Sequence, residues 1–214
     1  MTVNRSTLRR TAVALVAAGT ASLMLAACGS DGDSAPAHGS HASASASASA
    51  SAPASAGQHN AADTAFAKGM IPHHRQAVEM ADLAPSRARS AAVKKLAEEI
   101  KKAQDPEIET LSGWLTSWGE DVPAAGSMDH SGHDMGDMSG MMTGEDMAEL
   151  KKAKGRAFDT AFLDMMIEHH EGAVEMAKAE RSGGAHARAK KMADRIITSQ
   201  SAEIDRMNQL LGRG

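Results

Sequence analysis

The strongest constraint in this sequence is an internal duplication with a constant offset of 96 residues (159 − 63). The run Asp-Thr-Ala-Phe at 63–66 recurs from Asp159, and Met-Ile-x-His-His-x-x-Ala-Val-Glu-Met-Ala at 70–81 recurs at 166–177. The register continues without a gap to Gln-x-x-Glu-Ile, which begins at Gln104 and again at Gln200. A duplication of this kind indicates one supersecondary unit that packs against its own copy to bury a core.

Each repeat has the apolar spacing of two helices, with residues three and four apart on one face. A single hairpin of ~50 residues buries too little surface to be stable alone. The sequence therefore predicts an all-α protein, an antiparallel four-helix bundle made from two repeated helical hairpins, the repeats covering about 62–118 and 146–212 of a domain at 62–212. Helix breaks are expected at 83–86 and 181–184, and kinks at Pro72 and Pro106. The four predicted helices are 62–82, 87–118, 146–181 and 185–211.

The first 27 residues have the features of an export signal. Arginines precede an apolar run from Thr11 to Ala27 that is short for a membrane span. The run ends in Leu-Ala-Ala-Cys at Cys28, which resembles the lipobox of bacterial lipoproteins, in which the cysteine is acylated. We therefore expect residues 1–27 to be removed and Cys28 to anchor the exported chain to the outer face of the cell membrane. The alternative is a plain signal peptide with an incidental cysteine.

Cys28 is the only cysteine, so the chain can form no intramolecular disulfide and no thiolate metal site. Residues 28–61 are rich in Ser and Ala and offer little apolar surface to bury, which predicts a disordered tether. Three histidines lie on this segment, His38, His41 and His59. They could add metal ligands, although isolated tether histidines are more often incidental.

A Met- and His-rich segment at about 120–145 separates the repeats. It has no helical period, and Gly and Ser interrupt it, so we expect a mobile loop. Methionine is uncommon in a solvated linker, and thioether and imidazole suit soft Cu(I). Three aspartates, Asp129, Asp134 and Asp137, add oxygen ligands for Cu(II). The predicted loop ligands, against the alternative of a plain linker, are Met128, His130, His133, Met135, Met138, Met141 and Met142.

Paired histidines on the first helix of each repeat form a second group of candidate ligands. A side chain at i+3 or i+4 lies beside residue i on a helix, so each pair has a methionine as its neighbour. Thioether with imidazole favours Cu(I) or Ag(I) over Ca²⁺ or Mg²⁺. The alternative is that these methionines fill the core with the histidines at its polar edge. The residues in this group are Met70, His73, His74, Met80, Met166, His169, His170 and Met176.

Several other classes of function are disfavoured. The Glu-x-x-His motifs of di-iron carboxylate bundles are absent, as is His-Glu-x-x-His, so an enzyme such as a metal-ion oxidase is not expected. The net charge is −4, which indicates no broad basic face for nucleic acid.

The motif Phe-x-x-x-Met-Ile-x-His-His-x-x-Ala-Val-x-Met-Ala, at 66–81 and 162–177, resembles the bacterial family called domain of unknown function 305. A second motif, Ile-x-x-x-Gln-x-x-Glu-Ile-x-x-Leu/Met, at 100–111 and 196–207, supports this resemblance. The resemblance implies a ferritin-like helical bundle, often exported, with some members linked to periplasmic copper binding through Met and His. It implicates the same eight residues of the two helical pairs. Pro72 departs from the second copy, where Glu168 stands.

These observations lead to two hypotheses. The first is a lipid-anchored, extracytoplasmic protein that sequesters or delivers copper, with Cu(I) or Ag(I) held by Met and His. The second is a non-catalytic structural or interaction bundle of the cell envelope, whose histidines belong to the core. A protein partner cannot be derived from either hypothesis.

Overall fold

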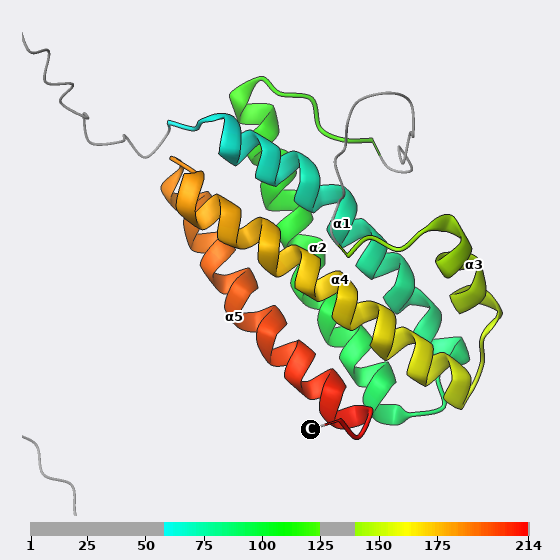
Figure 1. The fold of residues 1–214 in the computed structure, drawn as a ribbon. Coiled ribbons are helices and arrows are strands. Elements are labelled where there is room, and N and C mark those ends of the chain that lie inside the picture. Colours follow the sequence, from blue (N-terminus) through cyan, green and yellow to red (C-terminus); the bar gives the residue numbers. More distant parts are fainter. Residues whose placement is uncertain (1–57, 125–139, 214) are drawn as a thin grey trace, which may run out of the picture. The chain divides into compact units, whose positions relative to one another are not determined.

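The computed structural model describes residues 58–124 and 140–213, and within these ranges it contains five helices and no β-strand (Figure 1). The predicted all-α class is therefore confirmed. None of the helices described is long and apolar enough to cross a membrane. The expected signal peptide, Cys28 and most of the expected tether lie outside the described residues. The helices are α1 (Ala61–Arg87), α2 (Ala91–Trp118), α3 (Gly144–Lys152), α4 (Arg156–Gly183) and α5 (Ala187–Leu210).

Four long helices pack as two hairpins joined along their first helices. Helix α1 packs on α2, α4 packs on α5, and α1 lies along α4 (Figure 1). The α1–α4 pair is antiparallel, because Asn60 at the start of α1 donates its side-chain amide to the Gly183 carbonyl at the end of α4, at 2.8 Å. At the other end the Gly155 amide donates to the Arg87 carbonyl, also at 2.8 Å.

Side-chain caps define where these helices begin. Asn60 and Asp63 form a capping box at α1, in which each side chain accepts from the other residue's backbone amide. Ser90 caps α2 and His186 caps α5, each by accepting the backbone amide three residues ahead. Positions 90 and 186 are 96 residues apart, so the duplication extends to the start of the second helix of each repeat.

The helix predicted at 146–181 was wrong, because the structure contains two helices there. A capping box between Thr143 and Asp146 starts α3, which ends at Lys152. Gly155 then has φ +63°, a left-handed conformation that a residue with a side chain rarely adopts. Its amide donates to the end of α1, so a tertiary hydrogen bond stabilises the break between α3 and α4.

The break expected at 83–86 was also misplaced. Helix α1 continues through Pro85 to Arg87. Pro85 lies in the last turn, where it removes one intrahelical hydrogen bond, and the helix still closes with the Ala88 amide donating to Ala84 at 2.9 Å. Pro72 and Pro106 likewise lie inside continuous helices.

Two apolar clusters fill the bundle. One contains Met80, Phe162 and Met166, and the other contains Phe66 and Met70. The first cluster also includes Met142, whose side chain is buried. The sequence had placed Met142 in a mobile loop, so that interpretation was wrong for this residue. The segment just before α3 contributes to the core.

Candidate metal centre

The four paired histidines lie together in the middle of the bundle. His73 and His74 come from α1, His169 and His170 come from α4, and all four are fully buried. The rings of His73 and His169 face each other with centroids 3.8 Å apart and planes inclined by 44°. The two predicted pairs therefore form one cluster at the interface between the repeats.

The second histidine of each pair, which we call the outer histidine, has a carboxylate partner on the neighbouring helix. His74 Nε2 lies 2.9 Å from Glu107 Oε2, and His170 Nε2 lies 2.6 Å from Glu203 Oε2. Within the described ranges, Nδ1 of His74 and of His170 is buried and has no hydrogen-bond partner. If each neutral ring donates Nε2–H to its carboxylate, each Nδ1 keeps its lone pair. This carboxylate–histidine arrangement is common behind metal-ligating imidazoles.

His169 is held in its neutral form. Burial lowers the pKa of His169 well below its usual value, and the neighbouring His73, His170 and His74 lower this pKa further by charge repulsion. The backbone of His73 offsets part of this effect. The His169 ring therefore stays uncharged at neutral pH, which is the state that binds a metal.

The four methionines predicted as ligands on α1 and α4 are divided between the two apolar clusters of the bundle. Met70 belongs to one apolar cluster, against which Met176 packs half-buried, whereas Met80 and Met166 belong to the other. The packing of these four methionines agrees both with a role in the apolar core and with a role as metal ligands.

The histidine cluster is not a ready-made site of the usual nitrogen and oxygen type. Across residues 58–124 and 140–213, no group of three or more His, Cys, Asp or Glu side chains is placed to hold one ion. A metal bound here would need thioether ligands in addition to imidazole, or a small rearrangement of the rings.

The predicted loop ligands fall into two groups. Met128, His130, His133, Met135 and Met138 lie outside the described residues. Met141 is half-buried and Met142 is buried. The side-chain amide of Gln76 makes two hydrogen bonds to the backbone of Met142. Its Nε2 donates to the carbonyl of Met142 at 2.8 Å, and its Oε1 accepts from the amide of Met142 at 2.7 Å.

Three residues of this region were not predicted as functional, namely Gln76, Glu107 and Glu203. The two glutamates belong to the repeated Gln-x-x-Glu-Ile motif and follow the histidines by 33 residues in both copies. That equal spacing is a signal that could have paired them with the histidines. Gln76 has no such signal, because Gly172 stands at the equivalent position.

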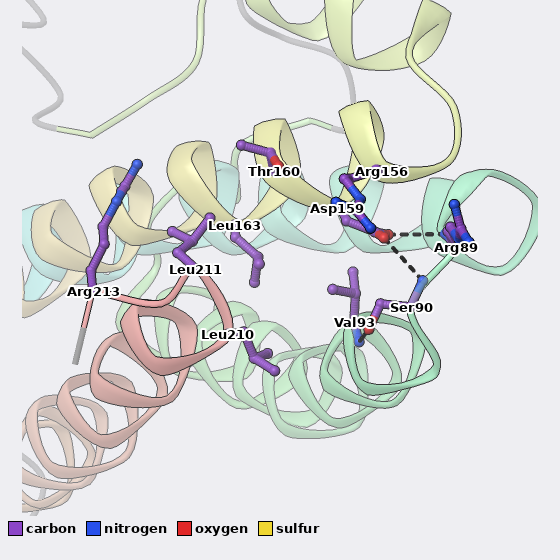
Figure 2. A pocket seen from close by; sticks show the side chains of 10 residues that line it. All are labelled: Arg89, Ser90, Val93, Arg156, Asp159, Thr160, Leu163, Leu210, Leu211 and Arg213. Atoms are coloured by element: carbon purple, nitrogen blue, oxygen red, sulfur yellow. Dashed lines mark hydrogen bonds between the residues drawn. The ribbon is translucent and has the colours of Figure 1, made fainter.

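Reciprocal carboxylate contacts hold the two ends of the bundle. Asp63 of the first repeat accepts the amides of Ala185 and His186 before α5. Asp159 of the second repeat accepts the amides of Arg89 and Ser90 before α2, at 3.0 Å each (Figure 2). Each repeat thus closes the hairpin turn of the other.

The pocket beside Asp159 contains none of the predicted ligands that the structure describes. Its lining includes Arg89, Arg156 and Arg213 (Figure 2). Arg213 forms an ion pair with Asp164. At the opposite end, His59 stacks on Trp118 with ring centroids 4.4 Å apart. The ring of His59, just before α1, therefore packs against the end of α2.

Solved structures similar to this chain include proteins that were crystallised with metals. A candidate secreted DUF305 protein from Streptomyces coelicolor is 33% identical, with a TM-score of 0.63, covering 71% of this chain and 91% of that one. CopM in its Cu(I)-bound form is 34% identical, with a TM-score of 0.57, covering 69% of this chain and 94% of CopM. The Cu(II)-bound form of CopM gives 37% identity, a TM-score of 0.59 and the same coverage. CopM has also been solved with silver bound.

No curated protein matches the chain. The family called domain of unknown function DUF305 matches residues 63–211, which include both hairpins and the segment between them. The chain is therefore a member of the DUF305 family.

Proposed function

We propose that this chain is a lipid-anchored, extracytoplasmic copper-binding protein that sequesters or delivers Cu(I). Met and His would bind the metal at two places, the histidine cluster between α1 and α4 and the Met- and His-rich segment between the repeats. The similarity to CopM, which has been solved with Cu(I), Cu(II) and silver, supports this proposal. Membrane attachment would come from lipid on Cys28.

The observation that supports the proposal most is the hydrogen bonding of the buried imidazoles. His74 and His170 each have one ring nitrogen beside a carboxylate and the other nitrogen buried without a hydrogen-bond partner in the parts described. A buried polar atom without a partner costs free energy unless a ligand or water satisfies it. An imidazole lone pair together with thioether donors would suit Cu(I), a soft ion.

A competition titration with Cu(I) and a chelating indicator tests the proposal. The wild-type chain should show a tight class of sites in the bundle and a weaker class in the segment. Ordering a flexible segment around an ion costs about 1–2 kcal/mol of backbone entropy per residue fixed, whereas helical ligands are already positioned. Changing His73, His74, His169 and His170 to Ala should remove the tight class and keep the weak one.

Two matched variants separate the sites and guard against unfolding. Replacing Met128, His130, His133, Met135 and Met138 with Ser keeps the chain length and should remove only the weak class. Met70→Leu with Met166→Leu conserves core volume, so it should preserve the fold and cost less than about 1.5 kcal/mol per site. The double variant should nevertheless weaken Cu(I) binding by the tight class, because it removes two thioethers. Circular dichroism checks the helicity of every variant.

The rival function is a structural or interaction bundle of the envelope, with core histidines. The lack of a ready-made three-residue His, Cys, Asp or Glu site in the described ranges favours this rival. It predicts that the wild-type chain has no tight Cu(I) class. It also predicts that a folded quadruple histidine variant binds as much metal as the wild type.

A further inference from the structure

The two repeats differ at the second position after the paired histidines. Gln76 on α1 stands where α4 has Gly172. The Gln76 side chain is buried, and its amide group makes two hydrogen bonds to the backbone of Met142. The other two buried glutamines, Gln104 and Gln200, leave Oε1 without a partner among the described residues. The side chain of Gln76 thus holds a segment from outside the repeats.

The same segment lies close against α4. Gly140 has φ +82°, and a Cβ atom at this position would lie 2.4 Å from the Glu168 carbonyl oxygen and 3.2 Å from the Gly172 Cα. The close approach is possible because Gly140 has no side chain. We call residues 140–142 the strap, since they contact α4 at one end and α1 at the other.

The strap crosses the level of the histidine pair. Gln76 follows His73 by three residues, and Gly172 follows His169 by three, which is about 4.5 Å along each helix axis. Because α1 and α4 are antiparallel, these two positions lie on opposite sides of the His73–His169 contact. The strap, which runs from Gly172 to Gln76, therefore spans the level of that contact along the helix axes, and Met141 lies between its two attachment points.

We propose that Gln76 is a positioning residue that holds Met141 at the histidine cluster, so that Met141 supplies a thioether to the bundle site. Met142 is the anchor of the strap, with its side chain in the core and its backbone on Gln76. The inference rests on the proposed function and assigns Met141 to the tight class rather than to the weak segment sites. The probe is Cu(I), whose soft character suits a donor set of thioether and imidazole.

The test compares two methionine substitutions in the full chain. Met141→Leu removes one thioether from a half-buried position, and Met147→Leu removes one from the apolar core at similar volume. At one equivalent of Cu(I), Met141→Leu should lower the affinity of the tight class and reduce the number of sulfur neighbours seen by X-ray absorption. Met147→Leu, on α3 and outside the predicted ligands, should leave both quantities unchanged.

Gln76→Leu should weaken the tight class 10- to 100-fold, as the loss of outer residues that orient metal ligands commonly does. Gln104→Leu is its matched control, a buried glutamine on α2, and should leave the affinity unchanged. If Gln76→Leu fails to fold, the comparison of Met141→Leu with Met147→Leu still decides.

The outcomes separate this inference from the function on which it rests. A wild-type chain without a tight Cu(I) class overturns the proposed function and the inference together. A tight class whose affinity and sulfur count are the same in wild type and Met141→Leu overturns only the inference. Equal losses in Met141→Leu and Met147→Leu would also overturn it, because they would indicate a general loosening of this part of the core.

Discussion

His73 of the first repeat and His169 of the second face each other across the interface of α1 and α4, with ring centroids 3.8 Å apart. The contact lies in the interface of the two duplicated helices, so the same residue of each repeat meets its own copy. Two histidine pairs that are 96 residues apart in sequence therefore make one buried cluster.

One cluster predicts one tight Cu(I) ion in each chain. His73→Gln and His169→Gln should each abolish the same tight class, because both remove a ring from a shared site. Titration of both variants against a chelating indicator measures this. If each variant instead lost half of the tight sites, the repeats would bind metal independently and the shared centre would be wrong.

The carboxylates behind the outer histidines should tune metal affinity. Glu107→Gln and Glu203→Gln remove the negative charge that orients His74 and His170, and each should weaken Cu(I) binding 10- to 100-fold. Glu109→Gln, on the same helix as Glu107 but exposed, is the control and should change nothing. Equal affinities for all three variants would place the glutamates outside the metal site.

The reciprocal aspartates should stabilise the bundle. Asp159→Ala leaves the amides of Arg89 and Ser90 without their acceptor and should lower the free energy of unfolding by about 1–3 kcal/mol. Asp205→Ala, an exposed carboxylate on α5, should have no comparable effect. Urea denaturation followed by circular dichroism measures both, and matching curves would argue against the contact.

Glu180 should make stability depend on pH. It is buried beside Asp63, and burial together with that neighbour raises the pKa of Glu180 to about 8. Because the unfolded pKa is near 4.5, the folded state holds a proton that the unfolded state loses between these values. The stability due to Glu180 is complete below pH 4.5 and decreases as the pH rises towards 8.

Glu180→Gln should remove this dependence, since an amide does not titrate. The stability of the variant relative to wild type should increase from pH 5 to pH 8 in urea denaturation. The opposite end of the bundle has no equivalent carboxyl group, because Ala84 stands at the position that corresponds to Glu180. Parallel stability curves for wild type and variant across this range would contradict the raised pKa.

The lipid anchor is testable by fractionation. Wild-type protein expressed in a bacterium that processes lipoproteins should partition with membranes, whereas Cys28→Ala should be found in the soluble fraction. The reason is that acyl chains on Cys28 would be the only membrane attachment we propose. Identical distributions of the two proteins would disprove the anchor.

Much of the fold could be predicted from the sequence because the helical period is local and was present twice. The constant offset indicated two hairpins, and four of the observed helices begin or end within a few residues of the predicted bounds. The break between α3 and α4 was missed because it depends on Gly155 reaching the carbonyl of Arg87, a residue 68 positions earlier (155 − 87). No local pattern reports such a bond.

The candidate site divides in the same way. The sequence by itself determined which residues carry imidazole and thioether and that each set occurs twice on one helical face. Only the tertiary structure decided that His73 meets His169, that Glu107 and Glu203 lie behind the outer rings, and that Gln76 holds Met142. The physical reason is that helical spacing specifies neighbours within one helix, whereas contacts between helices follow from how their buried faces pack.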